Sequence, residues 1–302
     1  MALLELRHVE KNYGRFKALQ DINLSVDNKS IFGLLGPNGA GKTSMIRIVT
    51  NITGADSGEV LLNNEPLRED HSSIIGYMPE ERGLYKKMKV WEQLVYLARL
   101  KGLSYNDART KVYYWMDRLN IKDWWGKRIE ELSKGMGQKI QFISTVVHDP
   151  KLIILDEPFS GLDPINANLI QNEIHDLKEK GATVIFSTHR MEQVEEICEN
   201  IALIDKGKII LSGKVTDIKN QFKENVFKVE FEGTAPELRE EYFPIEHRNA
   251  HSLLLKMNNG ATLRDLLKTL ADQDSHVTSF REILPSLNEI FIQQVTAAKA
   301  HA

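Results

Sequence analysis

One eight-residue segment constrains this sequence more than any other. It reads Gly36-Pro37-Asn38-Gly39-Ala40-Gly41-Lys42-Thr43 and matches the pattern G-x-x-x-x-G-K-[ST]. A short apolar run, residues 30–35, precedes it, and residues 43–50 follow with apolar side chains at helical spacing. Glycine lets backbone N–H groups converge at the positive end of a helix, where phosphate groups bind. The segment therefore predicts a nucleotide-phosphate loop inside an α/β fold.

The side chains at the end of this loop have separate expected roles. Lys42 supplies a positive charge for the β- and γ-phosphates of ATP, and the Thr43 hydroxyl is placed to ligate Mg²⁺. We assign all eight loop residues and the following Ser44 to nucleotide binding.

A second pattern places two carboxylates at the end of a buried strand. Residues 152–155 are apolar, and Asp156 and Glu157 follow them directly. Ligands bind at the carboxyl edge of a parallel sheet. We expect Asp156 to hold Mg²⁺ and Glu157 to orient the attacking water and accept its proton. Strands often end in acidic residues for other reasons. The pattern therefore indicates a catalytic site only in combination with the phosphate loop.

Alternating strands and helices predict a mainly parallel sheet, with an N-terminal antiparallel β subdomain. Residues 1–220 are expected to form this domain, with a helical insertion at about 88–147. Residues 225–302 read as a small separate α+β domain. Its predicted strands and helices lie at 226–231, 252–257, 263–271, 277–283 and 287–295.

Composition limits the partners of the chain. The 39 basic and 42 acidic residues give a net charge of −3, so there is no overall basic excess for a nucleic-acid backbone. Lys86, Lys87 and Lys89 are the best local candidate for such contacts, although three lysines in four residues are more often just a solvated surface. The single Cys198 forms no internal disulfide. No apolar run approaches the roughly 18 residues that span a bilayer, so a membrane role requires a partner.

Further motifs follow the loop in a fixed order, and together they resemble the nucleotide-binding subunit of an ABC transporter over about residues 3–220. They are the Q-loop position at residues 76–83, the signature Leu132-Ser133-Lys134-Gly135-Met136, Walker B at Asp156-Glu157, the D-loop at residues 160–163 and the switch histidine in Ser187-Thr188-His189. Residues 79–85, the signature and the tail at 285–291 are similar to ABC-2-type bacterial export ATPases, including those for sodium or drug extrusion.

The resemblance implies roles for individual residues. Tyr13 would stack on adenine, unless it is only an exposed aromatic at a strand end. Ser133 and Gly135 would contact the γ-phosphate of ATP held by a second subunit. His189 would sense the γ-phosphate of the ATP bound by its own chain and steady the transition state, unless it is a plain surface histidine. Asp163 would couple the two sites, or simply cap the turn before residue 164.

Two positions depart from the family pattern. Glu80 replaces the usual glutamine, and its carboxylate can still ligate Mg²⁺. The alternative is that Glu80 faces solvent and that Glu81 or Arg82 makes the contact. Lys134 and Met136 replace glycine and glutamine in the signature, which leaves the glutamine contact in doubt, although Gln138 is near.

The leading hypothesis is an ATPase subunit that dimerises, with itself or with a homologue, and powers a separate membrane permease. We expect it in the cytoplasm, on the inner face of the membrane through that permease, without nucleic acid. A soluble ABC ATPase of ribosomes or DNA, or a regulatory nucleotide-binding module, is the alternative. Co-purification of a permease, or a neighbouring gene for a protein of about six spans, would favour the first hypothesis.

Overall fold

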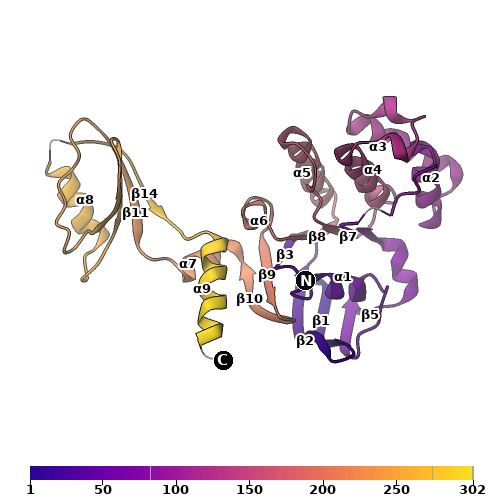
Figure 1. The fold of residues 1–302 in the computed structure, drawn as a ribbon, viewed down its shortest axis with the longest axis horizontal. Coiled ribbons are helices and arrows are strands. Elements are labelled where there is room, and N and C mark those ends of the chain that lie inside the picture. The colour runs from indigo at the N-terminus through magenta and orange to yellow at the C-terminus, as the bar shows by residue number, and fades with distance from the viewer. Residues whose placement is uncertain (82, 274, 301–302) are drawn as a thin grey trace. The chain divides into compact units, whose positions relative to one another are not determined.

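The computed structural model describes residues 1–81, 83–273 and 275–300. The chain divides into two compact units, Met1–Val215 and Thr216–Ala302, and Figure 1 shows the elements of each. Within these described ranges, no helix is both long and apolar enough to cross a membrane.

A six-stranded sheet organises the first unit. Its order is β10-β9-β3-β8-β7-β6, and all neighbouring strands run parallel except β10 beside β9. Every residue of β3, β7 and β8 is buried, which explains why β3 and the first four residues of β7 are continuous apolar runs in the sequence. The strands are β3 (Ile31–Leu35), β6 (Ile75–Met78), β7 (Leu152–Asp156), β8 (Thr183–Thr188), β9 (Asn200–Asp205) and β10 (Lys208–Lys214).

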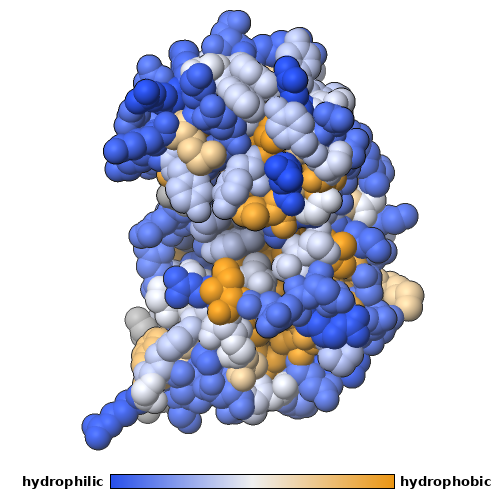
Figure 2. Space-filling model, turned by 90° about the vertical axis from the view of Figure 1, so that its right-hand side faces the viewer, coloured by the Kyte–Doolittle hydropathy of each residue, from blue (hydrophilic) through white to orange (hydrophobic). Residues whose placement is uncertain are grey.

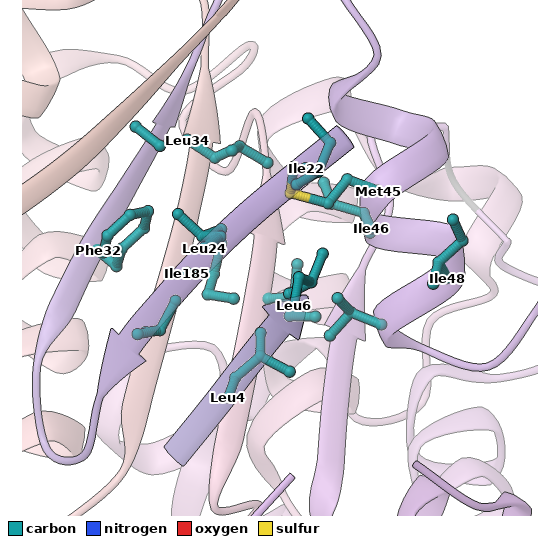
Figure 3. Packing of buried hydrophobic residues seen from close by; sticks show 14 of the residues in the cluster. Leu4, Leu6, Ile22, Leu24, Phe32, Leu34, Met45, Ile46, Ile48 and Ile185 are labelled. Atoms are coloured by element: carbon teal, nitrogen blue, oxygen red, sulfur yellow. The ribbon is translucent and has the colours of Figure 1, made fainter. Parts of the chain in front are cut away.

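An antiparallel sheet of order β2-β1-β4-β5 packs with α1 (Lys42–Val49) over the same core. Its strands are β1 (Ala2–Tyr13), β2 (Phe16–Asp27), β4 (Ser57–Leu62) and β5 (Glu65–Pro66). Figure 3 shows leucine and isoleucine side chains of both sheets meeting those of α1, among them Leu6, Ile46 and Ile185. This packing anchors the N-terminus of α1 beside the ends of the parallel strands.

Helices complete the first unit. A helical region contains α2 (Val90–Leu100), α3 (Tyr105–Arg118) and α4 (Lys134–Val146). Two more helices, α5 (Pro164–Glu179) and α6 (Met191–Ile197), connect the parallel strands. The short 3-10 turns are η1 (Glu69–Ile74), η2 (Lys122–Trp124) and η3 (Ile129–Glu131). Helix α6 ends at Ile197, because Cys198 is already extended.

The second unit contains a four-stranded antiparallel sheet of order β12-β13-β11-β14. One face of it is packed against α8 through a separate apolar cluster. Strand β12 was not predicted, and it forms the hairpin with β13, which also pairs with β11. The elements are α7 (Val215–Gln221), β11 (Val226–Glu232), β12 (Ile245–Arg248), β13 (Ser252–Lys256), α8 (Leu263–Ala271), β14 (His276–Ile283) and α9 (Leu287–Ala300). The predicted fold class, including the antiparallel N-terminal subdomain and the C-terminal α+β part, is confirmed.

Candidate nucleotide site

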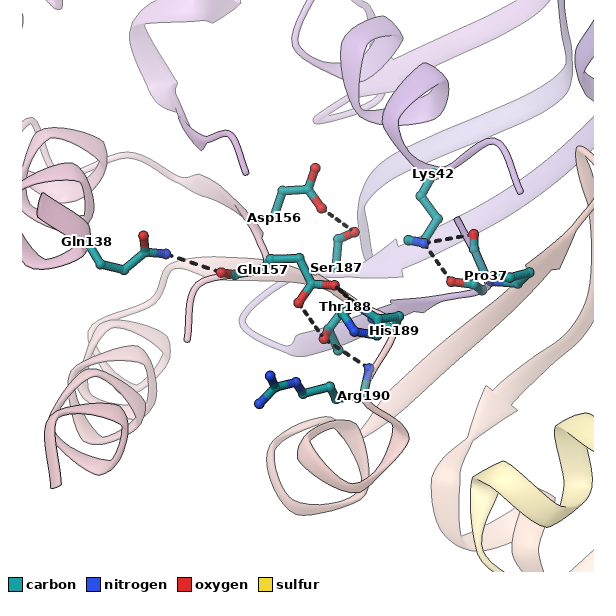
Figure 4. Close-up of polar contacts among 10 residues, drawn as sticks. Pro37, Lys42, Gln138, Asp156, Glu157, Ser187, Thr188, His189 and Arg190 are labelled. Carbon is teal, nitrogen blue, oxygen red and sulfur yellow. Dashed lines mark hydrogen bonds and ion pairs between the residues drawn. The ribbon is translucent and has the colours of Figure 1, made fainter. Parts of the chain in front are cut away.

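A cavity of about 300 Å³ opens at the carboxyl edge of the parallel sheet. Its walls come from segments far apart in the sequence, which the parallel strands bring to one edge. They are the phosphate loop from Pro37 to Ser44, Phe16 at the start of β2, Glu80 after β6, and Asp156 and Glu157 at the end of β7. Figure 4 shows the polar contacts of this region.

Two loop glycines are required by their surroundings. Gly36 has φ 151°, and a Cβ added there would lie 2.2 Å from the carbonyl oxygen of Ile204. Gly41 has φ 116°, and its added Cβ would lie 2.6 Å from the carbonyl oxygen of Ala18. Any larger residue would therefore push the loop away from both sheets.

Lys42, at the end of the loop and the start of α1, is buried. Its Nζ donates to the carbonyl oxygens of Gly36, at 2.6 Å, and Pro37, at 3.1 Å. Burial lowers the pKa of Lys42, and the charge of Asp156 partly opposes that shift. The ammonium group is thus held in place and faces a wall of carboxylates.

Asp156 is the buried carboxylate of that wall. The hydroxyl of Ser187, on the neighbouring strand β8, donates to its Oδ1 at 2.8 Å. Burial raises the pKa of Asp156, because the low-polarity surroundings disfavour its charged form.

The carboxylate of Glu157 is oriented by the switch segment. Thr188 Oγ1 donates to its Oε2 at 3.0 Å, the backbone N–H of His189 donates to its Oε1 at 2.9 Å, and His189 Nδ1 lies 2.6 Å from the same oxygen (Figure 4). The backbone of Glu157 has φ 49°, an uncommon conformation for this residue type. Gln138 of α4 supports it by donating to the carbonyl oxygens of Glu157 and Pro158.

Glu80 lines the cavity opposite the phosphate loop. The alternative contact through Arg82 concerns a residue outside the described ranges, and Glu81 does not line the cavity. Tyr13 lies in the β1–β2 hairpin and does not line the cavity, whereas its cross-strand partner Phe16 does, although both rings are largely exposed, at 46% and 60%. Sequence reasoning missed Phe16, although an aromatic residue placed directly after the Gly14-Arg15 turn was the available signal.

The signature lies apart from this cavity. Ser133 is exposed and caps α4, because its Oγ accepts from the backbone N–H of Met136 at 3.3 Å. Neither Ser133 nor Gly135 lines the cavity, and a Cβ added to Gly135 would lie 3.0 Å from the Gly161 carbonyl oxygen. Asp163 accepts from the backbone N–H of Asn166 and caps α5. This contact fits the simpler of the two roles predicted for Asp163, which is to cap the turn before residue 164.

Comparison with known proteins identifies the family. Residues 19–160 match the family model of the ABC transporter, and residues 213–295 match that of the ATP-binding protein DrrA1-3-like C-terminal domain. The uncharacterized ABC transporter ATP-binding protein YhaQ of Bacillus subtilis (strain 168) is 41% identical over 296 residues, which are 98% of this chain and 99% of YhaQ. This chain belongs to the ABC transporter ATP-binding proteins.

Other members agree in sequence and fold. The linearmycin resistance ATP-binding protein LnrL of Bacillus subtilis (strain 168) is 28% identical over 302 residues, or 96% of this chain and 97% of LnrL. A solved ATP-binding subunit of an ABC transporter superposes with a TM-score of 0.69 at 28% identity, covering 73% of this chain and 93% of that one. The predicted identity as an ATP-binding ABC ATPase that serves transport is confirmed.

Proposed function

We propose that this ABC ATPase powers an ABC-2-type exporter, from the inner face of the cell membrane, as one of two ATPase subunits bound to a separate permease. The similarity to LnrL and the match of residues 213–295 to a DrrA1-3-like domain support the exporter type. The observation that carries the ATPase mechanism is the Glu157 carboxylate, held by Thr188 and His189 on the wall of the phosphate-loop cavity.

In this proposal Glu157 is the general base. Its two oxygens are fixed by donors from the 187–189 segment, so the carboxylate is oriented before a water molecule reaches it. His189 contacts this base directly, and the proposal gives it the further role of sensing the γ-phosphate, although it does not itself line the cavity. Lys42 stabilises the charge that develops on the transferred phosphoryl group.

We infer that Thr43, Glu80 and Asp156 hold Mg²⁺ with the nucleotide. All three oxygen donors line one cavity, and hard oxygen ligands suit this ion. The described residues contain no group of three His, Cys, Asp or Glu side chains able to hold a metal ion alone. Phosphate oxygens must therefore complete the site, as is usual for Mg²⁺, which neutralises charge on the phosphates when bound.

We propose that Ser133 and Gly135 act on ATP held by a second subunit. They begin α4, whose N-terminus is a suitable position for a phosphate. Within one chain they do not reach the cavity that holds Lys42. The proposal predicts that a monomer binds ATP but hydrolyses it poorly.

The surface of the helical region is the proposed docking site for the permease. Figure 2 shows several apolar patches, separated by hydrophilic side chains, on the face of the molecule that it draws. A groove of about 530 Å³ lies beside α2, and Tyr96 and Leu100 on its walls are 43% and 65% exposed. Exposed apolar patches of this kind mark protein–protein contacts.

The decisive experiment replaces the proposed base. Glu157→Gln keeps the size of the side chain and should leave ATP binding intact while lowering turnover by about 10²–10⁴-fold. ATP should then trap a dimer, measured by size-exclusion chromatography with light scattering. Glu81→Gln, an exposed neighbour outside the cavity, is the control. Unchanged steady-state hydrolysis in Glu157→Gln would remove Glu157 from this role.

A further inference from the structure

Two segments of the helical region, residues 86–90 and 127–130, run antiparallel beside each other. They are held by backbone hydrogen bonds of 2.9 to 3.0 Å, which join Val90 to Lys127, Ile129 to Met88 and Glu130 to Lys86. The segments lie far apart in the sequence, so the fold alone makes them neighbours.

Apolar and basic side chains of these two segments are separated by their burial. Val90 and Ile129 are buried, and Met88 is half-buried. The packing of these apolar side chains leaves a set of exposed basic residues at the surface. They are Lys86, Lys87, Lys89, Lys127 and Arg128.

The positive charges of this set exceed the negative charges beside them. Glu130 pairs with Arg128 at 3.6 Å, and Glu92 and Glu131 accept from the backbone N–H groups of Lys89 and Arg128. The four lysines form no ion pair with the residues that the structure describes. Five cations against three carboxylates leave a local charge of about +2, in a chain whose net charge is −3. Such a gathering of like charges is stabilised when an anionic partner covers it.

Aromatic side chains extend the same surface. The backbone N–H of Trp91 donates to the carbonyl oxygen of Trp125 at 3.4 Å, and their rings stack 5.9 Å apart. Tyr113 of α3 meets Trp125 edge-on and is 53% exposed. Tyr113 and Trp125 also line a cavity of about 680 Å³, together with Arg109. We call the five basic residues with Trp91, Tyr113 and Trp125 the basic–aromatic patch.

This combination of side chains favours a membrane surface over other anionic partners. Lysine and arginine are attracted to the phosphates of an anionic leaflet, and tryptophan and tyrosine rings are stable at the level of the headgroups. A nucleic acid calls for a basic stripe or face, which a local charge of about +2 does not provide.

We propose that the basic–aromatic patch binds the anionic phospholipid headgroups of the inner leaflet. The lysines contact the phosphates, and the aromatic rings lie among the headgroups. The ATPase thereby gains a contact with the membrane in addition to its contact with the permease. The inference rests on the proposed place of the chain at the membrane, and the test below uses the chain without the permease.

The experiment is flotation of the full chain with lipid vesicles. Vesicles of phosphatidylcholine with about one third phosphatidylglycerol should bind the chain at least about tenfold more tightly than pure phosphatidylcholine vesicles. Added salt should weaken this binding, because it screens the charges. Replacing Lys86, Lys87 and Lys127 together by glutamine should lower the affinity about 10²-fold, since each lysine near such a surface contributes about fivefold.

The matched control replaces three other exposed lysines of the first unit, Lys151, Lys180 and Lys214, by glutamine. It changes the net charge equally but outside the patch, and the affinity for vesicles should stay within about twofold. Lipids with brominated chains should quench the tryptophan fluorescence of the bound chain, and Trp125→Phe should reduce this quenching. ATP hydrolysis without vesicles should be the same in both lysine variants and the unmodified chain.

Several results would overturn the inference. They are equal binding to both kinds of vesicle, an equal loss of affinity in the control variant, and no quenching by the brominated lipids. Tighter binding of a single-stranded oligonucleotide at the same salt concentration would make the patch a nucleic-acid site instead. If the patch variant loses the permease but keeps the vesicles, the patch is a permease contact. A chain that binds anionic vesicles but no permease would support the inference and contradict the proposed function.

Discussion

The phosphate-loop side and the signature side of this cassette differ in how their polar groups are satisfied. At the loop, Lys42, Asp156 and Glu157 are bonded within the chain and meet around one cavity. At the signature, Ser133 is exposed and caps its own helix, away from that cavity. The loop side is therefore preorganised within one chain, and we propose that the exposed signature side completes the site of a partner subunit.

Removing the positive charge of Lys42 should lower ATP hydrolysis more than any other change considered for the two sides. Lys42→Ala takes away the cation that faces the phosphates and should lower kcat/KM for ATP hydrolysis by about 10³-fold. Nucleotide affinity should fall too, measured by titration with a fluorescent ATP analogue. Near-normal binding and turnover would show that the loop side is not the binding half.

A negative charge at the signature should lower the turnover of ATP and leave the binding of ATP unchanged. Ser133→Asp retains an N-cap for α4, so stability should be kept, but it places an anion where we expect a γ-phosphate. The expected loss in kcat is about 10²-fold, with ATP binding by the monomer unchanged. Turnover and the thermal midpoint are the two measurements.

Mixing the two variants sharpens the same test. A dimer of Lys42→Ala with Ser133→Asp contains one site in which both the loop and the signature are unmodified. Hydrolysis should therefore recover on mixing. If the mixture stays as inactive as its components, the signature does not act across subunits.

The smallest expected effect concerns the stability of the nucleotide-free protein. Burial raises the pKa of Asp156 above its ordinary value of 3.8, so its contribution to stability is complete below pH 3.8 and is lost as pH rises through the raised pKa. At neutral pH the buried charge of Asp156 costs free energy. Asp156→Asn removes that charge and should raise the thermal midpoint at neutral pH by about 2–4 °C. Scanning calorimetry across pH measures it.

Asp163→Asn is the matched control. Hydrogen bonds from Asn166 lower the pKa of Asp163, so its contribution is present above pH 3.8 and is lost as pH falls. Asparagine is an equally good cap, and no neutral-pH stabilisation should appear. A similar rise in both variants would show that the buried charge at the loop is not the cause.

Local patterns predicted much of the fold. The buried strands β3 and β7 were visible as apolar runs, and the loop motif located the start of α1. Strands β4 and β6 were missed, because β4 shows no alternating burial and β6 has only four residues. Strand β12 was missed because it is short and mostly exposed, so no apolar pattern marks it.

The sequence by itself determined the phosphate loop, since glycine spacing, a lysine and a helix start act over neighbouring residues. It also identified Asp156 and Glu157, because a strand end is a local feature. Only the tertiary structure decided that Phe16 lines the cavity while Tyr13 does not, and that Thr188 and His189 hold the Glu157 carboxylate. These contacts depend on strand order and helix packing between distant segments, which no spacing within one segment encodes.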